Sequence, residues 1–257
     1  WLKKIKDYSM TDYNIVIPAR YASTRFPGKP LIEINGKTML EHVYAVAKKS
    51  DAKNIVIATD DQRIKEVADK FCDTVLMTSD QHQSGTDRLA EVCEIMQWQV
   101  EDIVVNLQGD EPVTPPELLQ QVATNLHDFQ DCAIATLTTP IEEKCEIDDP
   151  NIVKVVSDIN GYALYFSRAA IPYKREVNEP TAENQYFRHL GIYAYRVEFL
   201  NNYNKMPQCP LETIEKLEQL RAMYHGYKIH TQQAVKLPGP GIDTPEDLQK
   251  VNALITQ

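Results

Sequence analysis

The sequence predicts an α/β fold with an open, doubly wound and mainly parallel sheet. Short apolar runs such as 14–18 and 54–58 alternate with segments whose apolar residues recur at helical spacing, as in Met39, Leu40 and Val43. The runs are apolar on both faces. This is typical of strands in a parallel sheet that helices cover on each side.

In the first half of the chain, the expected elements follow a strand–helix order. We expect strands at 14–18, 54–58, 75–77 and 102–107, and helices at about 38–50, after Asp61, at 84–97 and after Pro116. Aspartate at a helix start can cap free backbone N–H groups, so Asp61 marks the start of the second helix. Residues 1–12 are expected to be a flexible extension, with a short membrane-surface helix as the alternative.

In the second half, β-rich segments replace the alternation. We expect strands at 152–156, 162–166 and 190–195, a turn at 158–161 that joins the first two, a loop at 174–185, and helices at 212–225 and 245–255. Residues 13–257 therefore form one domain, with an inserted β-rich lobe at about 140–200 for substrate binding and dimerisation. The C-terminal helices are expected to pack back on the main sheet.

The bulk composition limits the classes of function. The chain has 257 residues, with 27 Lys and Arg against 37 Asp and Glu, which gives a net charge of -10. This balance argues against a nucleic-acid-binding surface, and no apolar stretch is long enough for membrane insertion. The five cysteines are scattered and lack a CxxC pair, which indicates reduced thiols in a cytoplasmic protein.

The loop after the first strand concentrates positive charge where open α/β sheets bind ligands. Residues 18–30 read PARYASTRFPGKP and hold the cations Arg20, Arg25 and Lys29, separated by the small residues Ala22, Ser23 and Thr24. Small residues let backbone N–H groups approach phosphate oxygens, which Arg and Lys neutralise. A solvated basic loop is the plainer interpretation. The GxxxxGK[ST] and GxGxxG motifs are absent, so side-chain charge must hold the phosphates.

Two aspartates occupy positions that suit a metal ion. Asp110 directly follows the fourth strand, and Asp243 precedes the last helix. Mg²⁺ prefers one or two carboxylates together with phosphate oxygens and water. Simple helix capping is the alternative for Asp243, whereas the tip that carries Asp110 and Glu111 has no evident structural need for two acids.

Seven separated blocks of sequence resemble the 3-deoxy-manno-octulosonate cytidylyltransferase (CMP-KDO synthetase) family. The blocks are PARYASTRFPGKPL (18–31), HQSGTDRL (82–89), VNLQGDEP (105–112), ALYFSRA (163–169), FRHLGIYAY (187–195), LEQLR (217–221) and GIDTPEDL (241–248). The resemblance implies a nucleotide-diphospho-sugar transferase fold and a reaction of CTP with the eight-carbon acid sugar that gives CMP-KDO and pyrophosphate. It also implies Mg²⁺, a homodimer and a role in lipopolysaccharide biosynthesis.

The same resemblance implies the roles of individual residues. Arg25 and Lys29 would hold the β- and γ-phosphates, and Asp110 and Asp243 would bind Mg²⁺. The expected nucleotide-binding residues are Arg20, Ser23, Ser84, Gly85, Thr86 and Arg88, and the expected sugar-binding residues are Gln108, Arg168, His189, Tyr193, Glu218 and Gln219. From the residues alone, the helix start at Ser84 offers free backbone donors to a ligand, with an ordinary N-cap as the alternative, whereas His189 would be a structural histidine and Tyr193 a core aromatic.

Other functions remain open at this point. Within enzymes, the chain could activate sialic acid or an 8-amino-octulosonate, because one changed substituent needs only subtle differences in a pocket. A glycosyltransferase on a similar sheet would carry a metal-binding Asp-x-Asp, from which Asp110-Glu111-Pro112 departs. A non-catalytic nucleotide-binding regulator is the alternative from another class.

Overall fold

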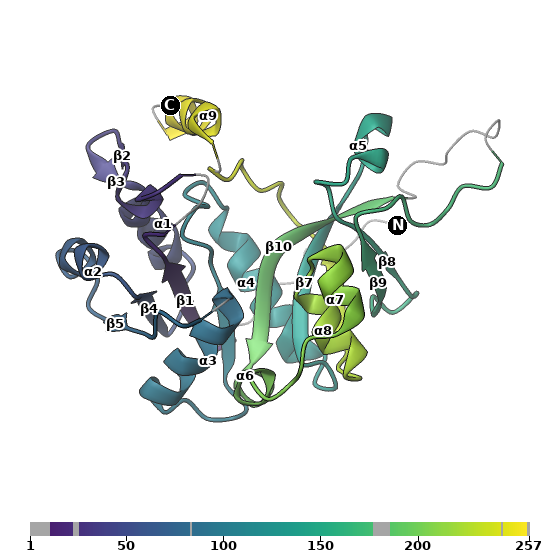
Figure 1. The fold of residues 1–257 in the computed structure, drawn as a ribbon, viewed down its shortest axis with the longest axis horizontal. Coiled ribbons are helices and arrows are strands. Elements are labelled where there is room, and N and C mark those ends of the chain that lie inside the picture. The colour runs from purple at the N-terminus through teal and green to yellow at the C-terminus, as the bar shows by residue number, and fades with distance from the viewer. Residues whose placement is uncertain (1–10, 23–25, 83, 177–185, 243, 256–257) are drawn as a thin grey trace.

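A nine-stranded sheet with helices on both faces forms the framework of the molecule (Figure 1). The computed structural model describes residues 11–22, 26–82, 84–176, 186–242 and 244–255. The strands of the sheet are β1 (Asn14–Ala19), β4 (Asn54–Thr59), β5 (Val75–Met77), β6 (Ile103–Asn106), β7 (Ile134–Pro140), β8 (Lys154–Ser157), β9 (Ala163–Ser167), β10 (Phe187–Arg196) and β11 (Ile229–Gln233). A separate short pair is formed by β2 (Glu33–Ile34) and β3 (Lys37–Thr38).

The helices are interspersed with these strands along the chain, and the last helix follows the last strand. They are η1, a 3-10 turn (Lys29–Leu31), α1 (Met39–Lys48), α2 (Gln62–Ala68), α3 (Gly85–Met96), α4 (Pro116–Asp128), α5 (Lys144–Asp148), α6 (Val197–Tyr203), α7 (Pro210–Glu215), α8 (Gln219–Tyr224) and α9 (Pro245–Ile255). Among the described residues, no helix has both the length and the hydropathy that crossing a bilayer requires.

The main path of the sheet runs β11-β7-β10-β6-β1-β4-β5. Along this path every neighbouring pair is parallel except those of β10, which is antiparallel to both β6 and β7. From β1 the chain builds outward to β4 and β5, then returns to β6 on the other side of β1. The carboxyl ends of β1 and β6 therefore flank a switch in strand order, where ligands bind in open α/β sheets.

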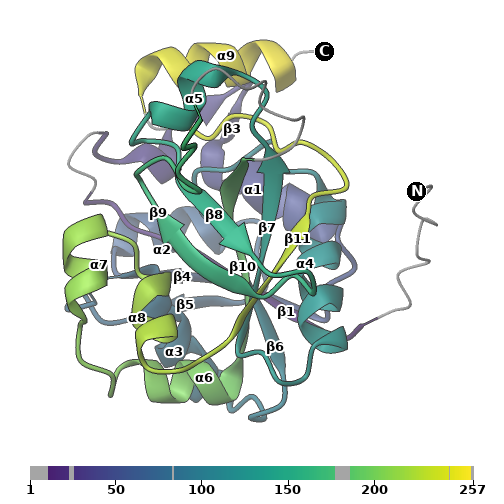
Figure 2. The same ribbon diagram turned by 90° about the vertical axis from the view of Figure 1, so that its right-hand side faces the viewer.

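Alternating side chains of β1 supply two separate cores. Ile15 and Ile17 pack with residues of α1, α2 and α4, whereas Val16 packs with residues of α3, α6 and α8. This alternation follows from the two-residue period of a strand. The expected sheet covered on both sides is confirmed, and Figure 2 shows the layers from the side of β8 and β9.

The β8–β9 hairpin and its turn at 158–161 are as expected, and the hairpin pairs with the first part of β10. The second half of β10 then enters the main sheet between β6 and β7. Two strands of this sheet, β7 and β11, escaped the sequence prediction. The expectation for residues 177–185 within the loop, and that for residues 1–10, lie outside the described residues.

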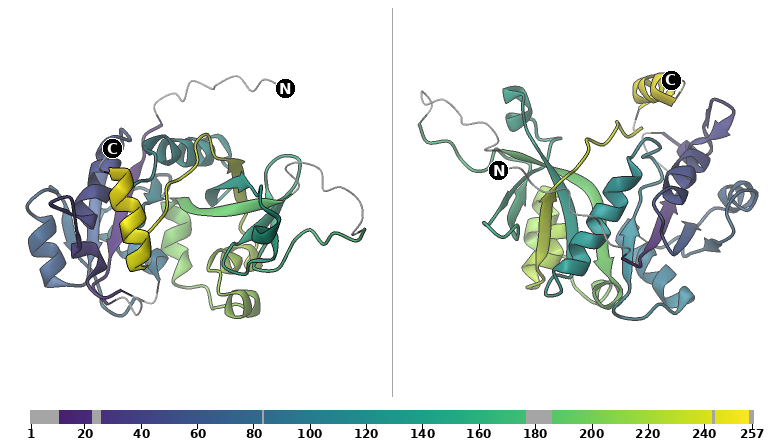
Figure 3. Two further views of the ribbon diagram at one scale, coloured as in Figure 1. Left: turned by 90° about the horizontal axis from the view of Figure 1, so that it is seen from above. Right: turned by 180° about the vertical axis from the view of Figure 1, so that it is seen from behind.

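The expected helix at 212–225 is wrong in one respect, because it is two helices. Lys216 adopts left-handed backbone angles (φ 54°, ψ 47°), which end α7 before α8 begins. The last helix has the expected bounds but packs against a small cluster around Ile34 and Met39 beside β2 and β3 (Figure 3). It therefore covers the edge of the α1 layer and not the main sheet.

Candidate active site

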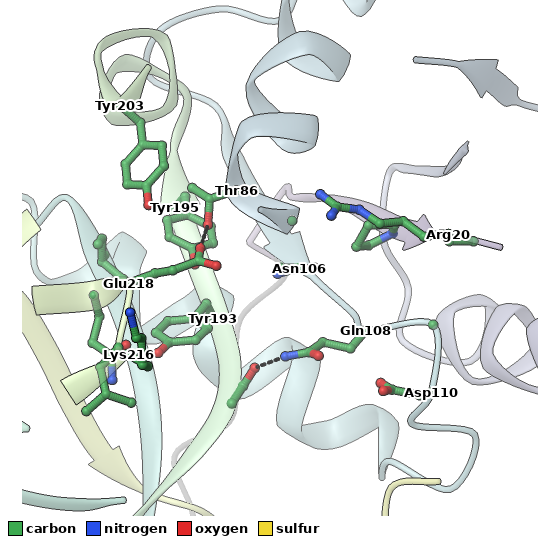
Figure 4. A pocket seen from close by; sticks show the side chains of 18 of the residues that line it. Arg20, Thr86, Asn106, Gln108, Asp110, Tyr193, Tyr195, Tyr203, Lys216 and Glu218 are labelled. Atoms are coloured by element: carbon green, nitrogen blue, oxygen red, sulfur yellow. Dashed lines mark hydrogen bonds between the residues drawn. The ribbon is translucent and has the colours of Figure 1, made fainter. Parts of the chain in front are cut away.

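A cleft of ≈ 550 Å³ opens at the carboxyl ends of β1 and β6. Several of the residues expected from the sequence line it, namely Arg20, Lys29, Gly85, Thr86, Gln108, Asp110, His189, Tyr193, Glu218 and Gln219. Figure 4 shows Tyr193 and Glu218 on one side of this cleft and Arg20 and Asp110 on the other. The cleft therefore joins a cationic end to a polar and aromatic end.

The cationic end is formed where the loops after β1 and β6 meet. Lys29 Nζ lies 2.7 Å from Asp110 Oδ2, and Arg20 donates a hydrogen bond of 2.6 Å to the Ser84 carbonyl. A Cβ at Gly109 would lie 2.9 Å from the Pro18 carbonyl oxygen, so glycine permits the close approach of the loop after β6 to the end of β1. Ser23 and Arg25 belong to the same loop but lie outside the described residues.

The two acids after β6 differ in their surroundings. The Asp110 carboxylate pairs with Lys29 and its side chain is 30% exposed. Burial, and then the charge of Asp110, raise the pKa of Glu111 to about 7, while the Thr114 hydroxyl donates to this carboxyl group. Asp110 is therefore the acid that is available to a ligand in the cleft, and Glu111 belongs to the loop's own packing.

The loop before α9, which carries the second expected metal ligand, contacts the backbone of Asp110. The Ile242 N–H donates a hydrogen bond of 3.0 Å to the Asp110 carbonyl oxygen. Asp243 itself lies outside the described residues. Among the described residues, no three His, Cys, Asp or Glu side chains gather to hold a metal ion. Asp110 at the phosphate end of the cleft nevertheless fits Mg²⁺, which takes few protein carboxylates and completes its shell with phosphate and water.

The start of α3 also lines the cleft. Ser84 is the N-cap and makes a capping box with Asp87, which confirms the plainer interpretation of its side chain. Gly85 and Thr86 line the cleft, and the Thr86 hydroxyl donates to Glu218 at 3.0 Å. Burial raises the pKa of Glu218 above its ordinary value.

Arg88, expected beside the nucleotide, does not line the cleft. Its guanidinium is fully buried, donates to the Thr78 hydroxyl and forms an ion pair of 2.6 Å with Asp60. Thr78 and Asp60 directly follow β5 and β4. Arg88 therefore ties the carboxyl ends of two strands to α3. Its side chain does not touch the cleft, but its positive charge, after burial, helps to lower the pKa of Arg20.

His189 and Tyr193 lie on either side of a bulge in β10 that faces the cleft. The Thr136 hydroxyl lies 3.0 Å from His189 Nε2 and also 2.8 Å from the Ile192 carbonyl, which can only accept. Because the Thr136 hydroxyl donates its proton to a carbonyl oxygen, it must accept from the histidine. We therefore assign the histidine proton to Nε2, which leaves Nδ1 as an acceptor. Burial lowers the pKa of His189 to about 3, so the ring is neutral at pH 7.

Two more of the expected sugar-binding residues lie nearby, and one does not. Gln108 donates a long hydrogen bond of 3.4 Å to the Gly191 carbonyl. Gln219 is buried, and its Nε2 has no hydrogen-bond partner among the described residues. The Arg168 guanidinium instead donates to the carbonyls of Glu215 (2.7 Å) and Pro150 (2.8 Å), and Arg168 does not line the cleft.

Asn106, Tyr203 and Lys216 are among the cleft-lining residues that the sequence analysis did not single out. Asn106 ends β6, and its buried Oδ1 has no hydrogen-bond partner among the described residues. The buried Tyr203 hydroxyl also has no hydrogen-bond partner there. Lys216 is the third. A polar residue at the end of the otherwise apolar run 103–105 was a usable signal for Asn106. Tyr203 and Lys216 carried none, because only the fold brings them to the cleft.

Comparison with known proteins agrees with this geometry. Residues 14–229 match the family model described as Cytidylyltransferase. The chain is 52% identical to the 3-deoxy-manno-octulosonate cytidylyltransferase of Pseudoalteromonas atlantica over 247 residues, which cover 94% of this chain and 97% of that protein. It is 51% identical to the protein of the same name from Idiomarina loihiensis, with coverages of 94% and 98%.

A solved structure has the same fold. It is that of CMP:2-keto-3-deoxy-manno-octonic acid synthetase complexed with CTP, with a TM-score of 0.88 and 42% sequence identity. The match covers 96% of this chain and 99% of that chain. The expected fold class, an open and mainly parallel α/β sheet of the nucleotidyltransferase type, is confirmed by this similarity.

Proposed function

Because this chain belongs to the cytidylyltransferase family, we propose that it joins CMP from CTP to 3-deoxy-manno-octulosonate and releases pyrophosphate. The observation that carries the proposal is a single cleft with a cationic, Asp110-bearing end and a polar end lined by His189, Tyr193 and Gln219. An eight-carbon polyol acid needs such a set of hydrogen-bonding groups. The product would supply the sugar for lipopolysaccharide biosynthesis.

In the proposed reaction, the C2 hydroxyl oxygen of the sugar attacks the α-phosphorus of CTP. The new P–O bond forms as the bond to the bridging oxygen of the β-phosphate breaks, pyrophosphate leaves with that electron pair, and the hydroxyl proton passes to solvent water. Positioning and charge neutralisation dominate such transfers. Lys29 would neutralise charge on the leaving pyrophosphate together with Arg25, which the family resemblance assigns to the same task. Arg20 would lie beside the triphosphate, over the backbone of Ser84 and Gly85.

The remaining expected residues are part of the same proposal. Ser23 and Thr86 would contact the nucleotide, and Gln108, Arg168 and Glu218 the sugar. Arg168 would first have to leave the carbonyls that its guanidinium contacts. Arg88 would support the nucleotide site from below through its buried ion pair with Asp60.

The proposal includes Mg²⁺ held by Asp110 and Asp243. Bound there, the ion would neutralise phosphate charge and lower the pKa of the attacking hydroxyl. The support comes from the exposed part of the Asp110 carboxylate and from the hydrogen bond that Ile242 donates to the Asp110 backbone. A dedicated protein base is then unnecessary, and the neutral His189 would instead accept a hydrogen bond from the sugar at Nδ1.

We also propose a homodimer in the cytoplasm. Leu164 on β9 is 61% exposed and Tyr173 beyond it is 85% exposed, so the lobe at about 140–200 offers apolar surface to a second copy. The five cysteines form no disulfide, and four of them are buried, as suits a reducing compartment. Light scattering of the purified chain would test the dimer, and a monomer at micromolar concentration would contradict it.

Pyrophosphate release tests the reaction. The chain would be given CTP, Mg²⁺ and, in turn, 3-deoxy-manno-octulosonate, its 8-amino analogue and sialic acid. We expect release with the octulosonate. Release only with the amino analogue or with sialic acid would replace the substrate, and binding of CTP without release from any sugar would favour a non-catalytic regulator.

A further inference from the structure

One wall of the cleft is a short non-helical turn. Lys216, Leu217 and Glu218 connect the end of α7 to the start of α8, and they line the cleft together with Gln219, the first residue of α8. Lys216 has the left-handed backbone conformation, which is unfavourable for a residue with a side chain. Such a turn keeps its shape only where surrounding contacts hold it.

The residue before this turn, Glu215, supplies the contacts. Its carboxylate accepts hydrogen bonds from the Ser167 hydroxyl (2.6 Å) and from the Arg168 N–H (2.9 Å) at the end of β9. Its backbone carbonyl accepts from Arg168 Nε at 2.7 Å. Three hydrogen bonds therefore tie the last residue of α7 to the end of a strand about 47 residues away in sequence, and the two that the Glu215 carboxylate accepts would remain if the Arg168 guanidinium turned to the sugar.

The other side of this anchor is fixed from the core. Lys154 on β8 is fully buried, and its ammonium donates to the carbonyl oxygens of Arg168 (2.6 Å), Ile152 (2.6 Å) and Asp149 (2.8 Å). The backbone of Arg168 is therefore bound on both sides: Glu215 accepts from its N–H, and Lys154 donates to its carbonyl oxygen. An anchor held at both groups can transmit a fixed position to the turn.

We infer that Glu215 is a positioning residue for the sugar end of the cleft. Its carboxylate binds the end of β9 and thereby sets the place of the turn at 216–218, which carries Glu218, and of Gln219, which follows the turn. Neither Glu215 nor Ser167 lines the cleft, so Glu215 acts through the turn. Gln219 has an unpartnered buried Nε2, which a displaced turn would carry away from the sugar.

This inference rests on the proposed function, in which the 216–219 side of the cleft receives the acid sugar and the Arg20 side receives CTP. It makes a prediction that a merely structural role does not make. Loss of the Glu215 carboxylate should weaken the binding of the sugar and leave the binding of CTP unchanged.

The test compares steady-state pyrophosphate release by the wild type, Glu215→Ala and Glu215→Gln. In Glu215→Ala we expect the KM for the sugar to rise by about tenfold, as for one lost charge-assisted anchor, while the KM for CTP changes less than about twofold. Glu215→Gln should recover most of the loss, because its amide can accept from the Arg168 N–H and donate to the Ser167 hydroxyl oxygen.

Asp131→Ala is the matched control. The Asp131 carboxylate also accepts two side-chain hydrogen bonds, from Lys228 (2.7 Å) and Tyr162 (3.0 Å), and also contacts the β8–β9 hairpin region, but Asp131 does not line the cleft. It should leave both KM values unchanged. Thermal unfolding of all variants would show whether they are folded at the assay temperature.

The outcomes separate the two claims. A wild type that releases no pyrophosphate with octulosonate contradicts the proposed substrate, and the same comparison is then made with the sugar that it accepts. An active wild type whose sugar KM is unaltered in Glu215→Ala overturns the positioning role alone. Equal increases of both KM values would overturn it as well, since they indicate a general loss of structure.

Discussion

Lys29 and Asp110 form an ion pair of 2.7 Å that joins the loop after β1 to the loop after β6. The lysine side chain is 9% exposed and the aspartate side chain 30%. A partly desolvated pair interacts more strongly than one in bulk water. The pair therefore holds a cation and a carboxylate together at the mouth of the cleft, where phosphate and metal would meet in the proposed reaction.

Replacing the cation of this pair should slow the chemical step. In Lys29→Ala we expect kcat to fall by about 100-fold or more, as for other lost charge-stabilising groups. Lys29→Arg should retain part of the activity, because it keeps the charge. Lys37→Ala, at a lysine whose side chain is 57% exposed on β3, is the control. Near-normal pyrophosphate release by Lys29→Ala would contradict the assignment.

Loss of the proposed metal site should stop the reaction. Asp110→Asn should abolish turnover while leaving the fold intact, and EDTA should do the same to the wild type until Mg²⁺ is restored. Glu111→Gln is the matched neighbour and should keep most of the activity, because Glu111 does not line the cleft and its carboxyl group accepts a hydrogen bond from Thr114. Circular dichroism would check the fold, and a fully active Asp110→Asn would refute the metal site.

The neutral His189 should make stability depend on pH. Burial lowers the pKa of His189 in the folded state to about 3, below the ordinary histidine value of about 6.5. The unfolded state therefore binds more protons between these two values, and stability is lost as the pH falls through this window. The loss is at most about 1.4 kcal/mol for each pH unit. Denaturant unfolding should show a shallower decline below pH 6 in His189→Gln; an identical decline would exclude His189 as its source.

Arg88 should prove important for stability. Arg88→Met would leave Asp60 without its partner and should cost about 3 kcal/mol of unfolding free energy, as for other broken buried pairs. Arg63→Ala removes a nearby aspartate pair whose arginine is 59% exposed, and it should cost less than about 1 kcal/mol. Urea denaturation measures both. Equal costs would show that the burial of Arg88 does not matter.

Much of the framework could be predicted because its signals are local. The strands at the centre of the doubly wound half are short apolar runs, and Ser84 and Asp61 cap helices in the expected places. The three cations after the first strand also stood out by their spacing. Hydrophobic period and capping depend on residues within a few positions of one another, which a sequence displays directly.

Other features depended on pairing between distant segments. β7 joins the sheet between β10 and β11, both of which come later in the chain, and its neighbours decide its place. The break at Lys216 interrupts a helical pattern directly after Glu215, whose carboxylate binds the end of β9. Neither property belongs to a local pattern of residues.

The amino-acid sequence by itself determined the doubly wound class, the cationic loop and, through its resemblance to one family, the residues to examine. The tertiary structure decided which of them share a cleft. It places the Thr86 hydroxyl 3.0 Å from the Glu218 carboxylate, 132 residues away in sequence. It also pairs the buried Arg88 with Asp60 and directs the Arg168 guanidinium to backbone carbonyls. The physical reason is that burial and charge pairing act through space, between side chains whose separation along the chain carries no information about their distance.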